Sequence, residues 1–377
     1  MTLARALGGW LGAALLLGGC AIFPPIGELP PERMSLDWAR PLYALEPLAY
    51  HPRETGRPLF VRTAATPPTG IVIVGAKDRI VRALDAATGA VVWTLPTSGA
   101  NVAQAAVAGD ALAVASTDGH VYRVAQRDGK VAWTSPYPGK SVLAAPVVAD
   151  ERVFVTSVDN RITALSWSDG ERIWDKRRPH AAEFTMTGQA GAVVSGDTVI
   201  TGFSDGQLVA FAREDGATVW SADLSGGQTE FVDVDTTPVL VGSIVVAGSY
   251  RQGLYGLDAA TGTVTWLMKG EGFGAPAEHE GVLYVPQASG RVVAVQASDG
   301  AVRWVARLTS DRAYTPAVSS KYVLAPMGES LVLIDRGSGR TLARYDDARG
   351  VDATPEFAFG TAYVLANSGT LYALGLY

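Results

Sequence analysis

Residues 83–93 read A-L-D-A-A-T-G-A-V-V-W, and this stretch decides the fold because the chain repeats its pattern many times. Asp85 and Gly89 bracket a tight turn, and Trp93 follows four residues after the Gly. Gly tolerates the positive φ that such a turn demands, while Asp or Thr side chains bond back to the turn backbone. The stretch therefore predicts a β-hairpin whose second strand carries a Trp.

The turn and its Trp recur along the whole chain. The copies are Gly89 with Trp93, Gly129 with Trp133, Gly170 with Trp174, Gly216 with Trp220, Gly262 with Trp266 and Gly300 with Trp304. A seventh copy, Gly339, has Ala343 in the Trp position. Successive copies are 40, 41, 46, 46, 38 and 39 residues apart. A period of about 40–45 residues is the length of one propeller blade.

Each unit has the composition of four short strands. Residues 237–266, for example, contain four β-branched or apolar runs separated by Gly, Ser, Asn or Asp turns. Such runs predict a four-stranded antiparallel meander. Helical signals are almost absent, so we expect an all-β fold.

The number of blades follows from the two ends of the repeat. The last unit, residues 361–374, lacks a fourth strand, and residues 36–40 form a lone strand with Trp38 and no preceding turn. We expect this strand to complete the last unit and close an eight-bladed propeller over residues 36–377. Seven blades with a flanking strand is the alternative. We expect the following tryptophans to lie between adjacent blades: Trp38, Trp93, Trp133, Trp174, Trp220, Trp266 and Trp304.

The N-terminus has the pattern of a cleaved leader. Arg5 precedes the apolar stretch Ala6–Leu17, which is too short to span a bilayer comfortably. The following Gly18–Gly19–Cys20 resembles the lipobox of bacterial lipoproteins, in which the Cys carries acyl chains such as palmitate. We therefore expect a signal peptide over residues 1–19 and a lipidated tether over 20–35. An ordinary signal peptide with an incidental Cys is the alternative. Ala21, rather than Asp, after the Cys favours the outer membrane by resemblance to lipoprotein sorting.

Composition excludes several other classes. The 377 residues are 48% hydrophobic, which is ample for a core and rules out wholesale disorder. The net charge of −6 does not suggest a nucleic-acid-binding face. A single Cys cannot form an internal disulfide or a multi-Cys zinc site.

The unit A-L-D-A-x-T-G-x-x-x-W resembles the quinoprotein (PQQ-type) propeller repeat. Together with the lipobox and eight units, the string D-V-D-T-T-P at residues 233–238 resembles the BamB family, lipoproteins of the β-barrel assembly machinery. The resemblance implies a non-enzymatic scaffold without a cofactor, anchored by lipid to the periplasmic face of the outer membrane. It also implies binding to the periplasmic repeat domains of the barrel-assembly protein BamA, and help in inserting β-barrel proteins, with unfolded outer-membrane proteins as further possible partners.

The resemblance also implies which residues bind the partner. Asp233 and Asp235 match the family string, and Phe184 and Met186 match the apolar positions of its other contact loop, in which Thr187 replaces an expected Arg. In that case Asp233→Arg with Asp235→Arg should abolish the association without unfolding the ring.

The spacing of the repeats points independently to the same loops. The two 46-residue spacings place extra length at residues 175–189 and 221–237, which emerge on one rim of consecutive blades. The second of these loops adds Phe231 as a further apolar anchor in an acidic rim. The alternative is that Asp233 and Asp235 only cap turns and that Phe231 fills a blade joint.

An enzyme must also be considered, because quinoprotein dehydrogenases share the repeat. They hold a quinone with calcium and commonly pack an adjacent Cys pair against it, whereas the sole Cys here is the expected lipid site. His51, His120, His180 and His279 are scattered and lack the spacing of metal ligands, so we expect no metal site. A PQQ-dependent dehydrogenase and a binding module of another envelope complex remain the alternatives.

Overall fold

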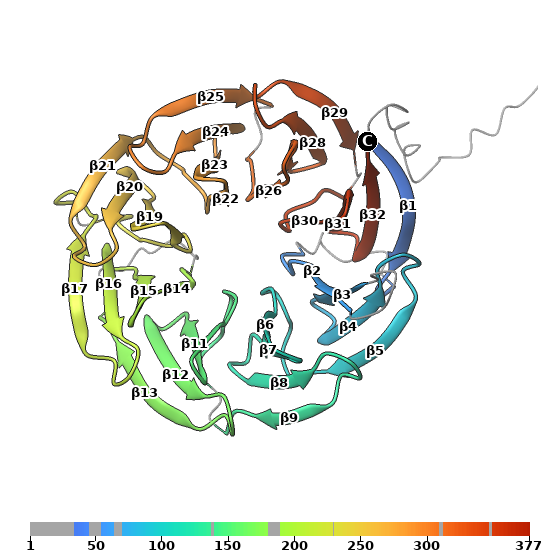
Figure 1. Cartoon of the computed structure of the whole chain (residues 1–377), viewed down its shortest axis with the longest axis horizontal. Helices are drawn as coiled ribbons and strands as arrows, with labels where there is room; N and C mark the ends of the chain where they lie inside the picture. The colour runs from blue at the N-terminus through green and yellow to red at the C-terminus, as the bar shows by residue number, and fades with distance from the viewer. Residues whose placement is uncertain are drawn as a thin grey trace, which may run out of the picture.

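The computed structural model describes residues 34–44, 54–63, 70–136, 139–179, 189–228, 230–308, 312–346 and 349–377. These residues form 32 strands, which assemble into eight four-stranded antiparallel sheets. The sheets stand around a central axis like the blades of a propeller (Figure 1). The predicted eight-bladed propeller is confirmed, and the seven-blade alternative is wrong.

The blades are numbered in chain order, and the strands of each blade run from the axis outward. Blade 1 contains β2 (Leu59–Arg62), β3 (Gly70–Gly75), β4 (Ile80–Asp85) and β5 (Val91–Pro96), and blade 2 contains β6 (Ala106–Ala108), β7 (Ala111–Ala115), β8 (Val121–Ala125) and β9 (Val131–Thr134). Blade 3 contains β10 (Val147–Ala149), β11 (Arg152–Ser157), β12 (Arg161–Ser166) and β13 (Arg172–Arg177), and blade 4 contains β14 (Ala192–Ser195), β15 (Thr198–Gly202), β16 (Gln207–Ala212) and β17 (Thr218–Asp223). Blade 5 contains β18 (Val239–Val241), β19 (Ile244–Ser249), β20 (Gly253–Asp258) and β21 (Val264–Lys269), and blade 6 contains β22 (Ala277–His279), β23 (Val282–Gln287), β24 (Arg291–Gln296) and β25 (Val302–Arg307). Blade 7 contains β26 (Ala317–Val318), β27 (Tyr322–Met327), β28 (Ser330–Asp335) and β29 (Thr341–Asp346), and blade 8 contains β30 (Glu356–Ala358), β31 (Thr361–Leu365), β32 (Thr370–Leu376) and β1 (Met34–Pro41).

The sequence of each strand follows its distance from the axis. Middle strands such as β19 pack against a neighbouring blade on both faces, so almost every residue is buried and apolar. Outermost strands such as β17 have one face in solvent and therefore alternate between exposed and buried residues. The core consequently lies between the blades rather than in one central mass.

Each regular joint between blades is built from one Trp and one Gly. The Nε1 of Trp93 donates to the carbonyl of Gln126 in blade 2 at 2.8 Å. Gly129, in the next turn of blade 2, has a φ of 71°, and a Cβ on it would lie 2.7 Å from the Trp93 ring. The same Nε1-to-carbonyl bond, at 2.8–3.0 Å, is made by Trp38, Trp133, Trp174, Trp220, Trp266 and Trp304. The repeat thus encodes the joints as well as the turns.

The N-terminal strand closes the ring. β1 pairs antiparallel with β32, from Met34 opposite Leu376 to Pro41 opposite Thr370, and is the outermost strand of blade 8. Met34 is 2% exposed, so the expected propeller boundary at residue 36 lies inside this strand.

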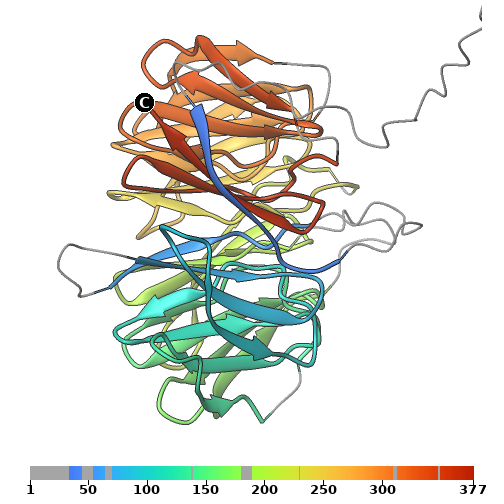
Figure 2. The same ribbon diagram turned by 90° about the vertical axis from the view of Figure 1, so that its right-hand side faces the viewer.

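The ring has two different faces, seen edge-on in Figure 2. On the hairpin face, the first strand of each blade turns into the second and, in blades 1 to 7, the third turns into the fourth. On the loop face, the second strand turns into the third and the chain passes to the next blade. β1 begins on the hairpin face, because its partner Leu376 donates its backbone N–H to Gly360 of the β30–β31 turn. β1 ends on the loop face, where Leu42 donates to Gly369. Cys20 lies outside the described residues.

The topology explains why the seventh repeat lacks its Trp. In blade 8 the two outer strands, β32 and β1, are far apart in sequence, so no hairpin turn joins them. Blade 7 therefore faces no turn glycine on which a Trp could pack. Ala343 takes the position instead, and Met34, Tyr345 and Tyr372 fill the same core cluster. The rings of Tyr345 and Tyr372 meet edge to face at 5.9 Å.

Candidate functional site

The long connection between β17 and β18 is anchored by apolar side chains. Leu224, Val232 and Val234 are all less than 5% exposed. Val234 lies so close to Gly202 of β15 that a Cβ there would be 2.4 Å from it. The middle residue of the D-V-D string therefore locks the connection into the joint between blades 4 and 5.

The threonines of the string are also structural. The backbone N–H of Gly248 in β19 donates to Thr236 Oγ1 at 2.8 Å. The backbone N–H of Gly191 donates to Thr237 Oγ1 at 2.9 Å. The second bond joins the end of the preceding long connection to this one, so the two connections meet on the loop face.

The two aspartates of the string occupy different environments. Asp233 is only 3% exposed, so it does not contribute to an exposed acidic rim as the sequence suggested. An Arg at this position would be buried, and burying a charge without a partner is costly. The paired Asp233→Arg and Asp235→Arg substitution would therefore disturb the fold as well as the surface.

Asp235 lines a cavity of about 520 Å³ at the centre of the loop face. Burial raises the pKa of Asp235 to about 6, and the negative charge of nearby Asp233 adds to this effect, while Arg312 opposes it. Lys77 and Arg312 also line the cavity. Asp235 is thus a carboxylate whose charged form is disfavoured by burial and partly compensated by Arg312, which suits it to bind a positively charged group.

The position of Asp235 recurs in every blade. Aligning the strand registers gives one equivalent residue per blade: Thr55, Val102, Leu143, Gln189, Asp235, Phe273, Ala313 and Asp352. Six of them line the central cavity. The other acid of this ring, Asp352, accepts a hydrogen bond from Asn367 Nδ2 at 3.2 Å. Six of the eight repeats therefore each contribute one variable residue to the cavity lining.

Phe231 lies at the outer part of the same connection. It is partly exposed, has a left-handed φ of 53°, and its ring lies 5.9 Å from the guanidinium carbon of Arg251. Arg251 is exposed in the turn between β19 and β20. The surface near Phe231 is therefore aromatic and cationic as well as acidic.

Only the ends of the other long connection are described. Arg178 holds its start through an ion pair with Asp205 at 2.7 Å. Gln189 holds its end by accepting the N–H of Leu143 at 3.1 Å. Phe184, Met186 and Thr187 lie outside the described residues.

The histidines are dispersed. His51 and His180 lie outside the described residues, and His120 contacts Asp118 at 3.1 Å. Over the described ranges, no group of three or more His, Cys, Asp or Glu side chains could hold a metal ion. In the same ranges, no helix is long and apolar enough to cross a bilayer.

Comparisons with known proteins bear on this site. The profile of the family described as outer membrane protein assembly factor BamB matches residues 77–272 and 251–376. The chain belongs to this family. The BamB proteins of Moranella endobia (strain PCIT) and Yersinia pestis are each 28% identical to it over 250 residues. These alignments cover 64% of this chain and 64% and 63% of the relatives, so the match spans just under two thirds of the relatives' length.

Solved structures share the fold. BamB from Moraxella catarrhalis superposes with a TM-score of 0.74 at 17% identity, covering 91% of this chain and 99% of that one. A europium-containing methanol dehydrogenase superposes with a TM-score of 0.72 at 13% identity, covering 91% and 93%. At these identities the likeness extends to the propeller alone, which family members and dehydrogenases have in common.

Two parts of the candidate site were not predicted from the sequence. Arg251 and Arg312 come to the D-V-D connection from a turn and from another blade, so no local motif contains them. The ring of equivalent positions could have been found, because it lies three residues before a Pro in six of the eight blades.

Proposed function

We propose that this chain is a non-enzymatic scaffold lipoprotein of the outer-membrane β-barrel assembly machinery. It binds the periplasmic repeat domains of BamA and aids the insertion of β-barrel proteins. Membership of the BamB family carries this proposal, since the family's relatives are described as outer membrane protein assembly factors.

The binding surface we propose is the loop face around the two long connections. Their ends are joined between Gly191 and Thr237, so they form one continuous surface. Phe231 with Arg251, and the cavity residue Asp235, provide an aromatic anchor and a carboxylate. Aromatic anchors beside desolvated charges are the usual centre of a protein interface. By resemblance to the family, we also propose Phe184 and Met186 as partner-binding residues.

The lipid anchor is proposed at Cys20, after removal of residues 1–19. β1 starts on the hairpin face, which is the side of the ring opposite the two connections. A protein held to the outer membrane in this way would present its loop face to a partner in the periplasm. The mass of the N-terminal peptide, with or without acyl chains, tests this point.

The central cavity supports binding rather than quinone chemistry. Asp235 is the carboxylate among its lining residues, beside the cations Lys77 and Arg312. Calcium requires about six to eight oxygen ligands. Dye reduction after addition of PQQ and calcium would overturn the non-enzymatic assignment.

Co-purification of BamA with the full lipidated chain from detergent-solubilised outer membranes tests the function. We expect Asp235→Arg and Phe231→Asp each to reduce the recovered BamA about tenfold or more, because each removes a buried or anchoring contact. Glu171→Arg is the matched control, since it makes the same charge change at an exposed residue of the hairpin face. Failure of BamA to co-purify with the unchanged chain would reject the function, whereas unchanged recovery with both variants would reject only the surface.

A further inference from the structure

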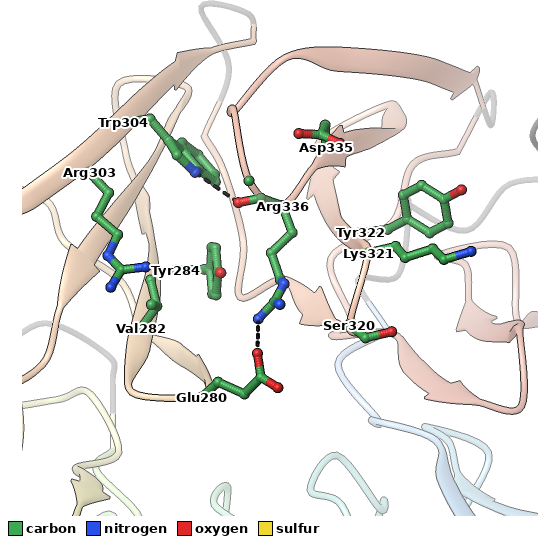
Figure 3. A pocket seen from close by; sticks show the side chains of 11 residues that line it. Glu280, Val282, Tyr284, Arg303, Trp304, Ser320, Lys321, Tyr322, Asp335 and Arg336 are labelled. Atoms are coloured by element: carbon green, nitrogen blue, oxygen red, sulfur yellow. Dashed lines mark hydrogen bonds and ion pairs between the residues drawn. The ribbon is translucent and has the colours of Figure 1, made fainter.

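The hairpin face carries pockets at three consecutive joints near the point of ring closure. The pocket between blades 6 and 7 has a volume of about 430 Å³ and is polar (Figure 3). In it, Arg336 pairs with Glu280 at 2.9 Å, and Trp304 donates to the carbonyl of Arg336. This is a regular joint in which Trp304 fills the space between the blades.

The pocket between blades 7 and 8 lies at the joint that has no Trp. It has a volume of about 510 Å³ and is lined by Tyr322, Phe357, Phe359, Leu376 and other residues of the hairpins β26–β27 and β30–β31. Figure 3 shows Tyr322 and Lys321 pointing away from the Glu280–Arg336 pair. The irregular joint thus leaves an aromatic pocket with a cation at its edge.

Phe359 connects this pocket to the next one. It also lines a pocket of about 240 Å³ between blades 8 and 1, where it meets the ring of Phe60 edge to face at 5.6 Å. Its side chain is 74% exposed, and its φ of 49° is a conformation that non-Gly residues adopt at a cost. The ring contacts Phe60 and lies 5.7 Å from the guanidinium carbon of Arg62, and its remaining exposed area adds to the apolar lining of both pockets. We call the two pockets that share Phe359 the seam groove.

β1 begins beside this groove. Met34, the first residue of β1, is buried in the cluster against which Tyr322, Phe357 and Leu376 pack. The thirteen residues that separate it from Cys20 read A-I-F-P-P-I-G-E-L-P-P-E-R. They combine four prolines with large apolar side chains and two glutamates.

The proline-rich segment and the seam groove are chemically complementary. Proline-rich segments favour the extended polyproline II helix and dock in aromatic-lined grooves at a small entropic cost. Glu28 of the segment is opposite in charge to Lys321 at the rim of the groove. Because the segment is covalently attached next to the groove, its effective concentration there is high.

We propose that residues 22–31 dock in the seam groove and cover Phe359. The docked segment shortens the reach of the anchor at Cys20 and fixes the hairpin face toward the membrane. The loop face with its two long connections then points away from it. The docking itself does not depend on BamA, so it can fail or hold independently of the proposed function.

Disulfide trapping tests the docking directly. The chain from residue 20 onward with Cys20→Ser has no other Cys. In it, Gly27→Cys is paired either with Ser320→Cys in the groove or with Ser243→Cys, in the corresponding hairpin of blade 5, two blades from blade 7 (Figure 1). We expect the Ser320 pair to form a disulfide at least about tenfold faster than the Ser243 pair. Slowed amide exchange of residues 26–29 provides a second readout.

The Phe359→Asn substitution distinguishes a segment that is bound in the groove from one that is only tethered near it. Asn removes the ring but suits the left-handed turn, so the propeller stays folded. We expect this substitution to slow the Ser320 pair about tenfold and to restore fast amide exchange in residues 26–29. Unchanged trapping and exchange would overturn the proposal. It would also be overturned by protection that appears only with phosphatidylethanolamine–phosphatidylglycerol vesicles, or by disulfides that form only between molecules, which would indicate a lipid surface or a second copy as the occupant.

Discussion

The joint between blades 4 and 5 and the joint between blades 7 and 8 occupy equivalent places in the ring but are built differently. At the first, Trp220 packs on Gly262 and donates to the carbonyl of Ala259 at 3.0 Å. At the second, Ala343 replaces the Trp, and tyrosines fill the cluster. The residue at the Trp position of a repeat depends on the hairpin turn of the next blade. The Trp is therefore replaced where that turn is missing.

The loop-face sides of the two joints differ as well. Asp235 faces the central cavity, and its pKa is raised to about 6 mainly by burial. The equivalent Asp352 belongs to a hydrogen-bonded chain. In it, Asn367 Nδ2 donates to Asp352, the backbone N–H of Glu54 donates to Asn367 Oδ1, and Tyr43 donates to Glu54. One joint therefore uses its acid to hold the ring closed, while the other leaves its acid at a cavity. This contrast supports our proposal that Asp235, rather than Asp352, contributes to partner binding.

Trp220→Ala should have the largest effect on the regular joint. Loss of the buried ring and its hydrogen bond should lower the free energy of unfolding by about 3–5 kcal/mol, measured by urea denaturation. At the other joint, Ala343→Gly removes only a methyl group and should cost about 1 kcal/mol. Equal losses at the two positions would mean that the Trp is not the element that holds the joint.

Gly262→Ala tests the other half of the regular joint. Its φ is 72°, and a Cβ would lie 2.5 Å from the Trp220 ring, so we expect a loss of about 2–3 kcal/mol. Gly242→Ala is the control, because Gly242 has a φ of 60° but no atom within 4 Å of its Cβ position. It should cost about 1 kcal/mol from backbone strain alone. If the two losses measured by urea denaturation agree, the Trp contact adds nothing.

The Ala343→Trp substitution tests whether the joint between blades 7 and 8 has room for the Trp that the other repeats carry at this position. Ala343 is 5% exposed and lies in a filled cluster, so the added ring should overpack it and cost about 1–3 kcal/mol. The midpoint of thermal unfolding measures the change. A higher midpoint would show that the cluster has room for the ring, and the missing turn glycine would then not explain why this repeat lacks its Trp.

The regular joints could be read from the sequence because each is a local pattern. The turn that contains Gly89 and the Trp93 that follows it lie within one hairpin, and the spacing of the hairpins set the blade length. The ring closure was also predictable, since the lone strand with Trp38 matched the strand missing from the last unit. Period and turn chemistry were sufficient for the fold.

The site was less predictable because its residues meet only in three dimensions. The sequence located the D-V-D connection, but not that Asp233 is buried while Asp235 faces the cavity. A string of alternating residues in an irregular connection carries no period from which exposure can be derived. Arg251 comes from a turn of the following blade and Arg312 from the connection between blades 6 and 7, so only the folded propeller brings them near this connection.

The smallest predicted effect is a pH dependence of stability that distinguishes Asp235 from Asp352. The pKa of Asp235 is raised in the fold above its unfolded value near 4, so protonation stabilises the folded state. This stabilisation is complete below pH 4 and is lost as the pH rises through 6. Asp235→Asn should therefore raise the free energy of unfolding at pH 7 by about 1–2 kcal/mol, and the gain should disappear between pH 6 and pH 4.

Asp352→Ala should act in the opposite direction. It leaves the amide of buried Asn367 without this acceptor and should lower the free energy of unfolding at pH 7 by about 1–2 kcal/mol. Urea titrations of both variants between pH 4 and pH 7.5 measure the two effects. A destabilising Asp235→Asn would mean that the cavity carboxylate supports the fold as Asp352 does. The contrast between the two joints would then give no reason to assign Asp235 to a partner.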